Sequence, residues 1–144
     1  MTAADIPRAI EIAASLPEAP HWPESAYLDA LNSESTPRRI ALVAVGLGNV
    51  QGFALASLLP PQAELELIAV SAGSQRQGMG RMLFDRLVHD LRAMGVLEIV
   101  LEVRTSNRAA VTFYRSAGFG QTGLRPAYYV DPIEDAVLMR LQLS

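Results

Sequence analysis

The stretch between residues 64 and 95 constrains the fold more than any other part of the sequence. Residues 64–70 alternate between acidic and apolar side chains and end in a continuous apolar run, which predicts a β-strand with a buried end. A loop of small residues and glycines follows at 71–80. Methionines and leucines then recur at helical spacing over 79–94, and Gly95 is suited to end that helix. The unit is therefore a strand, a glycine-containing loop and a long helix.

The rest of the chain supplies mixed strands and helices around this unit. Caps, prolines and apolar spacing predict helices at 2–16, 23–32 and 107–117, and β-prone segments at 40–45, 52–59, 97–104, 128–130 and 136–143. The turn composition of residues 46–49 predicts an antiparallel hairpin. Such a chain indicates an α+β or α/β arrangement of three layers, α/β/α. The helix from Met79 crosses over between two parallel strands, so its N-terminus opens at the sheet edge where ligands bind.

Composition narrows the classes of function. The chain has 144 residues, 50% of them hydrophobic, which suits one domain with one active site. A net charge of −3 without a basic stripe speaks against a nucleic acid partner. There is no cysteine, which removes disulfides and a cysteine nucleophile, and we expect a cytoplasmic protein. No apolar run approaches the roughly 20 residues that span a bilayer, so no membrane partner is expected. His21 and His89 lie far apart, and no metal site is expected.

The loop at 71–80 has the chemistry of an anion-binding site. Glycines let an anion approach the backbone, and the free N–H groups of a first helical turn favour negative charge. The pattern is Gln75-x-x-Gly78-x-Gly80, with arginines available as counter-charges. It is not a P-loop, which needs a glycine, four residues, and then Gly-Lys and a hydroxyl residue. It is not a Rossmann fingerprint either, because the position of the third glycine holds Leu83. Taken alone, the loop could equally be an ordinary glycine-rich turn into a helix.

Several motifs in order carry a family resemblance. The stretch from Leu65 through Gly80 into Leu87 resembles the coenzyme A-binding motif of the GCN5-related N-acetyltransferase (GNAT) superfamily. The similarity continues through residues 101–107 to 113–119 and covers about the C-terminal half. With Tyr128-Tyr129 and Glu134-Asp135-Ala136 it is most similar to the RimI-type ribosomal-protein-alanine N-acetyltransferases, which acetylate the α-amino group of a protein N-terminus.

The resemblance implies a fold and raises one discrepancy. It implies a mixed, mostly antiparallel sheet in which a central parallel strand pair is splayed at the cofactor site, within a single domain over residues 1–144. Members of the superfamily usually begin with a strand before the first helix. This chain enters a helical pattern by about residue 5, so the first family strand is expected to be missing or displaced. An exposed sheet edge would invite pairing with a second copy, and a homodimer is a possible outcome.

The resemblance also implies acetyl-CoA as co-substrate, no metal, and a role for each of two side chains. Glu102, in mid-strand, matches the general base, and Tyr114 matches the acid that protonates the coenzyme A sulfur. Without the resemblance, Glu102 could lie on a solvated strand face beside Arg104, and Tyr114 could be a core aromatic. The residues expected at the cofactor are Ile68, Ala69, Val70, Arg76, Gln77, Gly78, Met79, Gly80, Arg81 and Asn107.

Individual contributions differ within this set. Ile68, Ala69 and Val70 are expected to offer backbone groups to the pantetheine arm, and an N–H near Val70 to stabilise the oxyanion. Asn107 is suited both to contact the cofactor and to cap the following helix. The absence of cysteine favours direct transfer over a cysteinyl acyl-enzyme.

The acceptor is a primary amine, for which the resemblance favours the α-amino group of a protein or peptide N-terminus. Two rival hypotheses are acetylation of a small-molecule amine and binding of coenzyme A without catalysis. The segment 19–25 should lie near the acceptor, where Trp22 is either a pocket wall or an interior anchor.

Overall fold

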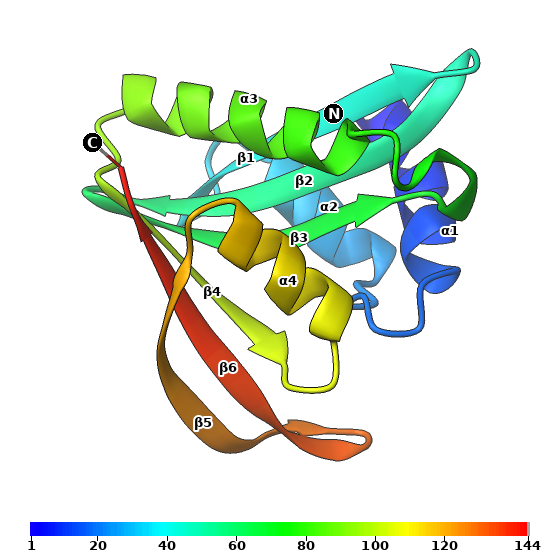
Figure 1. The fold of residues 1–144 in the computed structure, drawn as a ribbon. Coiled ribbons are helices and arrows are strands. Elements are labelled where there is room, and N and C mark those ends of the chain that lie inside the picture. Colours follow the sequence, from blue (N-terminus) through cyan, green and yellow to red (C-terminus); the bar gives the residue numbers. More distant parts are fainter. Residues whose placement is uncertain (144) are drawn as a thin grey trace.

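The computed structural model describes residues 1–143, and its centre is a twisted sheet of order β1-β2-β3-β4-β6-β5 (Figure 1). The strands are β1 (Arg38–Gly46), β2 (Asn49–Leu59), β3 (Gln62–Val70), β4 (Glu98–Arg104), β5 (Gly120–Val130) and β6 (Ile133–Gln142). Among these described strands only β3 and β4 pair in parallel, while β1–β2, β2–β3, β4–β6 and β5–β6 are antiparallel. The mixed, mostly antiparallel sheet with a central parallel pair is confirmed.

Helices cover both faces of this sheet, which gives the expected three layers (Figure 1). The helices α1 (Ile6–Ala14) and α2 (Glu24–Leu31) pack on one face, and α3 (Met79–Ala93) and α4 (Arg108–Ser116) pack on the other. Two short 3₁₀ turns, Ala3–Asp5 and Ala72–Ser74, are also present. None of the helices in residues 1–143 is long and apolar enough to cross a membrane.

Each face of the sheet carries its own hydrophobic core. Phe84, Leu87 and Phe119 belong to the core under α3 and α4, while Tyr27 and Phe53 belong to the core under α1 and α2. Strand β2 is buried on both faces over most of its length, which explains its nearly continuous apolar sequence. Fully burying each large apolar side chain contributes roughly 1.5–3 kcal/mol, so the two cores hold the three layers together.

A bulge in β3 opens the sheet at its centre. The β2–β3 register shifts at Leu55/Ala56, and Glu66 has no partner across the pair. As a result Leu65 packs into the α3–α4 core and Leu67 into the opposite one. The parallel pairing of β3 with β4 extends only from Gln62↔Glu98 to Glu64↔Val100. Beyond that point the two strands diverge, as the resemblance implies.

The strand at the β5 edge is the element whose length differs most from the sequence-based prediction. Residues 128–130 are expected as a strand, whereas β5 spans Gly120–Val130 and β6 begins at Ile133. Most of β5 is exposed and it contains Gly123 and Pro126, so it lacks the apolar alternation that signals a strand. In the described chain the first strand begins at Arg38, and helices precede it.

Candidate active site

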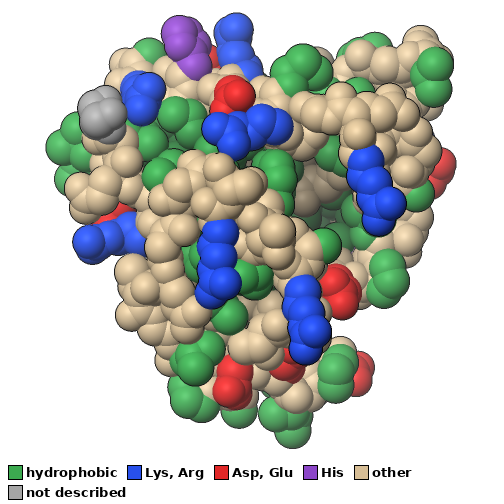
Figure 2. Space-filling view, in the orientation of Figure 1, with side chains coloured by type: hydrophobic (Ala, Val, Ile, Leu, Met, Phe, Trp, Pro, Cys, Tyr) green, Lys and Arg blue, Asp and Glu red, His purple; other side chains and the backbone are tan. Residues whose placement is uncertain are grey.

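Two cavities meet where β3 and β4 diverge. One has a volume of about 680 Å³ and the other about 520 Å³. Both are lined by Ile68 and Gln75 from the β3 side, and by Ala109, Ala110 and Tyr114 from α4. The space-filling view shows a hollow with apolar side chains in its floor and basic side chains around it (Figure 2). The two cavities therefore form one path through the sheet.

The smaller cavity contains most of the residues expected at the cofactor. One wall is the end of β3, whose β4-facing edge makes no pairing with β4 after Glu64. The other wall is α4, where the two alanines leave room for a chain-like ligand. The expected residues that line this cavity are Ile68, Ala69, Val70, Arg76, Gly78, Gly80 and Arg81. A free strand edge beside an apolar channel suits the amides and methylenes of a pantetheine arm.

The loop before α3 has the geometry of an anion cradle. Arg76 and Gly78 adopt left-handed conformations with φ of 62° and 80°, and Gly78 is the N-cap of α3. The first helical hydrogen bond runs from Met82 N to Gly78 O over 3.0 Å. The N–H groups of the three residues between them therefore have no partner within the helix. Turns of this kind leading into a helix N-terminus direct several amides toward one point, which suits a pyrophosphate.

Other expected cofactor residues are engaged elsewhere. The Gln77 side chain donates to the Gly73 carbonyl over 3.3 Å, and Met79 packs toward Gly46. Neither side chain lines the cavity, so contacts from these positions would be made by the backbone. Arg81 donates to Asp85 at 2.9 Å and to a carbonyl of α4 at 3.3 Å. Its guanidinium is thus partly used in joining α3 to α4.

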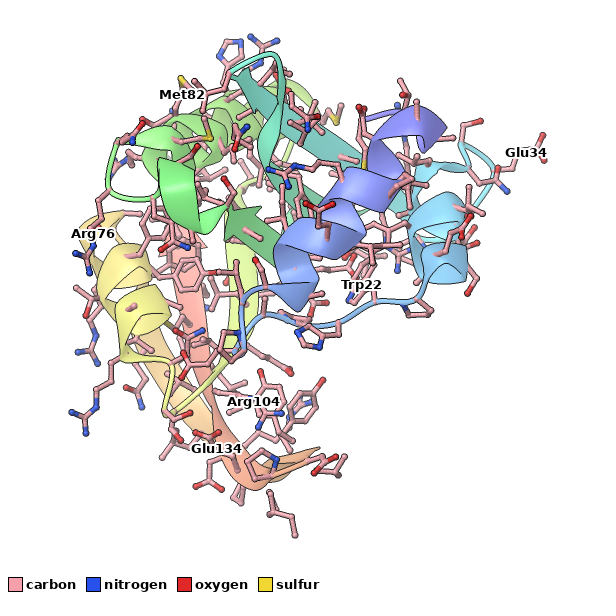
Figure 3. The ribbon with its side chains drawn as sticks, turned by 90° about the vertical axis from the view of Figure 1, so that its right-hand side faces the viewer. Trp22, Glu34, Arg76, Met82, Arg104 and Glu134 are labelled. Carbon is pink, nitrogen blue, oxygen red and sulfur yellow. The ribbon has the colours of Figure 1, made fainter. Side chains whose placement is uncertain are left out.

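Arg76 and Asn107 lie at different ends of the site. Arg76 is exposed and extends from the loop beside α4 (Figure 3). Asn107 is the N-cap of α4, and its side-chain oxygen accepts from Ala110 N at 3.1 Å. It lines the larger cavity rather than the smaller one. The capping role expected for Asn107 is confirmed.

Glu102 lies in the larger cavity because of the alternation of β4. Leu101 and Val103 point into the α3–α4 core, so Glu102 points to the opposite face, where its side chain is 21% exposed. Its partner is Arg125, at 3.2 Å, and not Arg104. A hydrogen-bonding contact with Glu102, followed by partial burial, raises the pKa of Tyr128. The carboxylate is therefore held by β5 at the mouth of the cavity.

Other carboxylates lie close to Glu102. Burial, followed by the charges of Glu66 and Glu102, raises the pKa of Glu64. Glu66, the bulge residue, lines the larger cavity and is paired with Arg39 at 2.8 Å. An acidic region of this kind favours a cationic ligand such as an ammonium group. Neither Glu64 nor Glu66 was expected at the site from the sequence, although the alternation of these glutamates with leucines in β3 is visible there.

Tyr114 lies at the junction of the two cavities. It is 9% exposed and packs edge-on against Phe113 and Phe119, with ring centroids 5.6 Å apart in each case. Burial, with a smaller contribution from Tyr129, raises the pKa of the Tyr114 phenol well above its usual range. The phenol is therefore protonated at neutral pH, as a proton donor must be.

Glu134 of β6 fastens the loop that leads into α4. Its carboxylate accepts from Ser106 N at 2.6 Å, Ser106 Oγ at 3.0 Å and Thr105 Oγ1 at 2.9 Å, and it pairs with Arg104 at 3.3 Å (Figure 3). These bonds, with Ser106 Oγ first, lower the pKa of Glu134 to about 2. The sequence gives no sign of this contact, since Glu134 stands 28 residues after Ser106.

The outer wall of the larger cavity comes from two distant segments. Residues 16–21, after α1, form one side, and Tyr129 and Asp131 of the β5–β6 hairpin form the other. Arg104 lies 4.3 Å from the centroid of the Tyr129 ring. Trp22 does not line this cavity; it packs against the α1–α2 core and is 5.6 Å from the Tyr27 ring. The structure therefore favours Trp22 as an interior anchor over Trp22 as a wall of the acceptor pocket.

Similarity to known proteins agrees with this geometry. The profile of the acetyltransferase (GNAT) family matches residues 7–119. The [ribosomal protein bS18]-alanine N-acetyltransferase of Escherichia coli (strain K12) is 41% identical over 99 residues, covering 67% of each chain. The N-alpha-acetyltransferase RimI of Mycobacterium tuberculosis (strain ATCC 25618 / H37Rv) is 38% identical over 97% of this chain and 88% of its own.

A solved structure extends the similarity to the whole fold. The crystal structure of the ribosomal-protein-S18-alanine N-acetyltransferase from Escherichia coli superposes with a TM-score of 0.86 and 33% identity, covering 100% of this chain and 91% of the other. Sequence profile, relatives and fold agree. The chain therefore belongs to the acetyltransferase (GNAT) family and is an acetyl-CoA-dependent N-acetyltransferase.

Proposed function

We propose that this protein transfers an acetyl group from acetyl-CoA to the α-amino group of a protein or peptide N-terminus, with Glu102 as base and Tyr114 as acid. The observation that carries the proposal is the position of these two side chains. Both line the larger cavity, and Tyr114 alone of the two also lines the smaller one. An acid at the junction and a base on the acceptor side suit direct transfer between two bound substrates.

The smaller cavity is the donor site in this proposal. When bound, acetyl-CoA supplies the activated acetyl thioester. The free amides at the start of α3 and the exposed Arg76 hold its pyrophosphate. The β4-facing edge of residues 68–70 binds the pantetheine arm, and a backbone N–H near Val70 stabilises negative charge on the carbonyl oxygen.

Glu102 prepares the amine. An α-ammonium group must lose a proton before its nitrogen can attack, and a carboxylate at the cavity wall accepts that proton directly or through water. The ion pair with Arg125 fixes the orientation of Glu102. The neighbouring Glu64 and Glu66 favour entry of a cation, so the same acidic region both attracts and deprotonates the acceptor.

Tyr114 completes the transfer. Its buried phenol, at the junction of the two cavities, donates a proton to the departing sulfur, which avoids release of a free thiolate into an apolar channel. The raised pKa keeps the phenol neutral until that step. Both proton transfers are therefore made by side chains of this chain.

The names of the relatives suggest which N-terminus to test first. A peptide that begins with alanine and carries the N-terminal sequence of ribosomal protein bS18 is the preferred acceptor. The larger cavity, open between residues 16–21 and the β5–β6 hairpin, has room for more than an amine alone. Acetylation of a small amine is the rival to be compared directly.

The test measures thiol release from acetyl-CoA with a panel of N-terminal peptides and polyamines. We expect the alanine peptide to give the largest kcat/KM. Faster turnover of the polyamines would support the small-amine hypothesis instead. Tight coenzyme A binding without thiol release on any acceptor would identify a binding module and contradict transferase activity.

Replacing the base gives a second, sharper test. Glu102→Gln preserves shape but cannot accept the proton, so we expect kcat to fall roughly 100- to 10,000-fold. Its affinity for coenzyme A, measured by calorimetry, should stay near the wild-type value. Glu98→Gln, at the far end of the same strand, is the matched control and should retain activity. Unchanged turnover in Glu102→Gln would show that another group is the base.

A further inference from the structure

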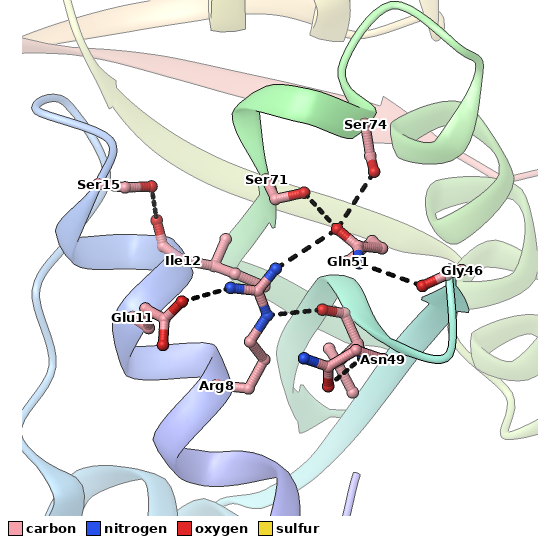
Figure 4. A network of polar contacts seen from close by, with 10 residues as sticks. Arg8, Glu11, Ile12, Ser15, Gly46, Asn49, Gln51, Ser71 and Ser74 are labelled. Atoms are coloured by element: carbon pink, nitrogen blue, oxygen red, sulfur yellow. Dashed lines mark hydrogen bonds and ion pairs between the residues drawn. The ribbon is translucent and has the colours of Figure 1, made fainter.

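The side chain of Gln51 is a buried polar centre behind the loop of the donor site. Gln51 is only 8% exposed, on β2, and lines neither cavity. Its Oε1 accepts from Ser71 Oγ at 2.7 Å and from Ser74 Oγ at 3.2 Å, and its Nε2 donates to Gly46 O at 3.1 Å (Figure 4). One amide therefore connects the β1–β2 hairpin to the loop before α3.

The backbone and α1 reinforce this connection. Ser71 N donates to the Gln51 carbonyl over 2.7 Å, so the side chain and main chain of Gln51 hold the same loop residue. Arg8 of α1 donates to Gln51 Oε1 at 3.4 Å and to Val50 O at 2.8 Å (Figure 4). The three donors to Oε1 therefore come from α1 and from the loop before α3, and this one oxygen joins the two.

The loop held in this way is the one that presents the anion-binding amides. Ser74 is 5% exposed and lies two residues before Arg76. Both Arg76 and Gly78 occupy left-handed conformations, and such a conformation at a non-glycine residue persists only when surrounding contacts impose it. Anion binding by backbone amides requires their spacing to be fixed in advance. The contacts of Gln51 with Ser71 and Ser74 provide that constraint from inside the protein.

We propose that Gln51 is a positioning residue for the pyrophosphate end of the acetyl-CoA site, acting through Ser71 and Ser74 without touching the donor. The proposal rests on the proposed function, since it assumes that the loop before α3 binds the donor. Gln51 would thus contribute to donor affinity from outside the cavity. Loss of the Gln51 side chain should therefore weaken binding of the pyrophosphate end of the donor, and should leave binding of the pantetheine arm unchanged.

The test compares two acetyl donors in Gln51→Leu, which keeps the side-chain volume and removes both polar atoms. S-acetyl-pantetheine lacks the pyrophosphate and adenosine, whereas acetyl-CoA has them. We expect the KM for acetyl-CoA and the calorimetric Kd for coenzyme A to rise by roughly tenfold, the effect of about 1.4 kcal/mol. The kcat at saturating acetyl-CoA and the kcat/KM for S-acetyl-pantetheine should change little.

Two further variants separate positioning from general loss of structure. Ser57→Ala removes an equally buried polar group of β2, 4% exposed, and should leave both donors unaffected. The double variant Ser71→Ala, Ser74→Ala keeps Gln51, and should reproduce the selective loss if Gln51→Leu does not fold. Combining it with Gln51→Leu should add little, because the residues act as one unit.

Two results would overturn the proposal. An equal loss of kcat/KM with both donors would show that Gln51 only stabilises the fold, and an unchanged Kd for coenzyme A would show that the loop does not need it. Failure of the proposed function gives a different result. A wild-type protein that releases no thiol would still be informative about Gln51, because the calorimetric comparison does not require turnover.

Discussion

The role proposed for Tyr114 follows from where its ring is buried. The residue belongs to the α3–α4 core, and the ring is held by Phe113 and Phe119. It still lines both cavities. Burial raises the pKa of the phenol, so the group stays protonated and neutral at physiological pH. The same side chain thus contributes to core packing and to the proposed proton donation.

Removing the Tyr114 hydroxyl should separate these two contributions. We expect Tyr114→Phe to lower kcat by roughly 100-fold or more while the ring packing and the unfolding free energy are preserved. In the wild-type protein, a raised pKa means that the phenol stays protonated, so kcat should not decline as pH rises toward about 10, the ordinary pKa of tyrosine. Steady-state kinetics across pH provide the measurement.

Tyr27→Phe is the matched control for that experiment. The Tyr27 hydroxyl is buried in the other core and has no hydrogen-bond partner among the described residues. Its removal should leave kcat unchanged. Equal rates for Tyr114→Phe and the wild type would contradict the assignment of the acid.

Among single residues, those whose placement depends on local pattern could be predicted from sequence. Glu102 stands out as a charge within an apolar strand, and Asn107 as a cap before a helix. Gln51 and Arg125 could not be found, because each depends on partners that only the folded chain brings near. Arg104 shows the limit of local reasoning, since it lies two residues from Glu102 on the same strand and yet pairs with Glu134.

At the scale of elements, the bulge in β3 creates the site. It changes which face each side chain of β3 occupies and is followed by the divergence of β3 from β4. The strand and the helix after it are visible in the sequence, because alternation and helical spacing are strong there. The point of divergence is not visible in local patterning and follows only from the family resemblance. The full length of β5 is not apparent from the sequence, because an exposed edge strand needs no apolar alternation.

The contact between Glu134 and the β4–α4 loop joins two elements and should depend on pH. The pKa of Glu134 is lowered from 4.5 to about 2 in the folded protein, so the unfolded chain takes up the proton first as pH falls. The contribution to stability is fully present above about pH 4.5 and is lost as pH falls toward 2. Urea unfolding at several pH values should show the gap between wild type and Glu134→Gln closing over this window.

A control with a single ion pair along one helix makes this prediction specific. Asp90 pairs with the exposed Arg86 of α3 at 3.2 Å, and Asp90→Asn should change stability much less, because an ion pair with a solvated partner contributes little. Because Glu134 orients the loop before Tyr114, Glu134→Gln should also lower kcat. A gap between wild type and Glu134→Gln that is independent of pH would contradict the role given to these hydrogen bonds.

At the scale of the whole molecule, two cores on opposite faces of one sheet leave a path between them. The proposed donor cavity is lined by two short stretches of sequence, residues 68–81 and 109–114, which is why its residues could be predicted from motifs in order. The proposed acceptor cavity is bordered by residues 16–21 and by the β5–β6 hairpin, which are far apart in sequence. Its shape follows from tertiary packing alone, and the sequence predicts the donor better than the acceptor.

The central claim is transfer of acetyl to an α-amino group, and the position of the acetyl group in the product tests it most directly. All 12 basic residues of the chain are arginines, so the enzyme itself offers no lysine that would compete as acceptor. An alanine-initiated peptide with one internal lysine is incubated with acetyl-CoA and the product is fragmented by mass spectrometry. We predict a single acetyl group on the N-terminal amine, and product formation by Glu102→Gln that is slower by roughly 100-fold or more. An acetyl group on the lysine side chain, or a product formed equally by Glu102→Gln, would contradict the account.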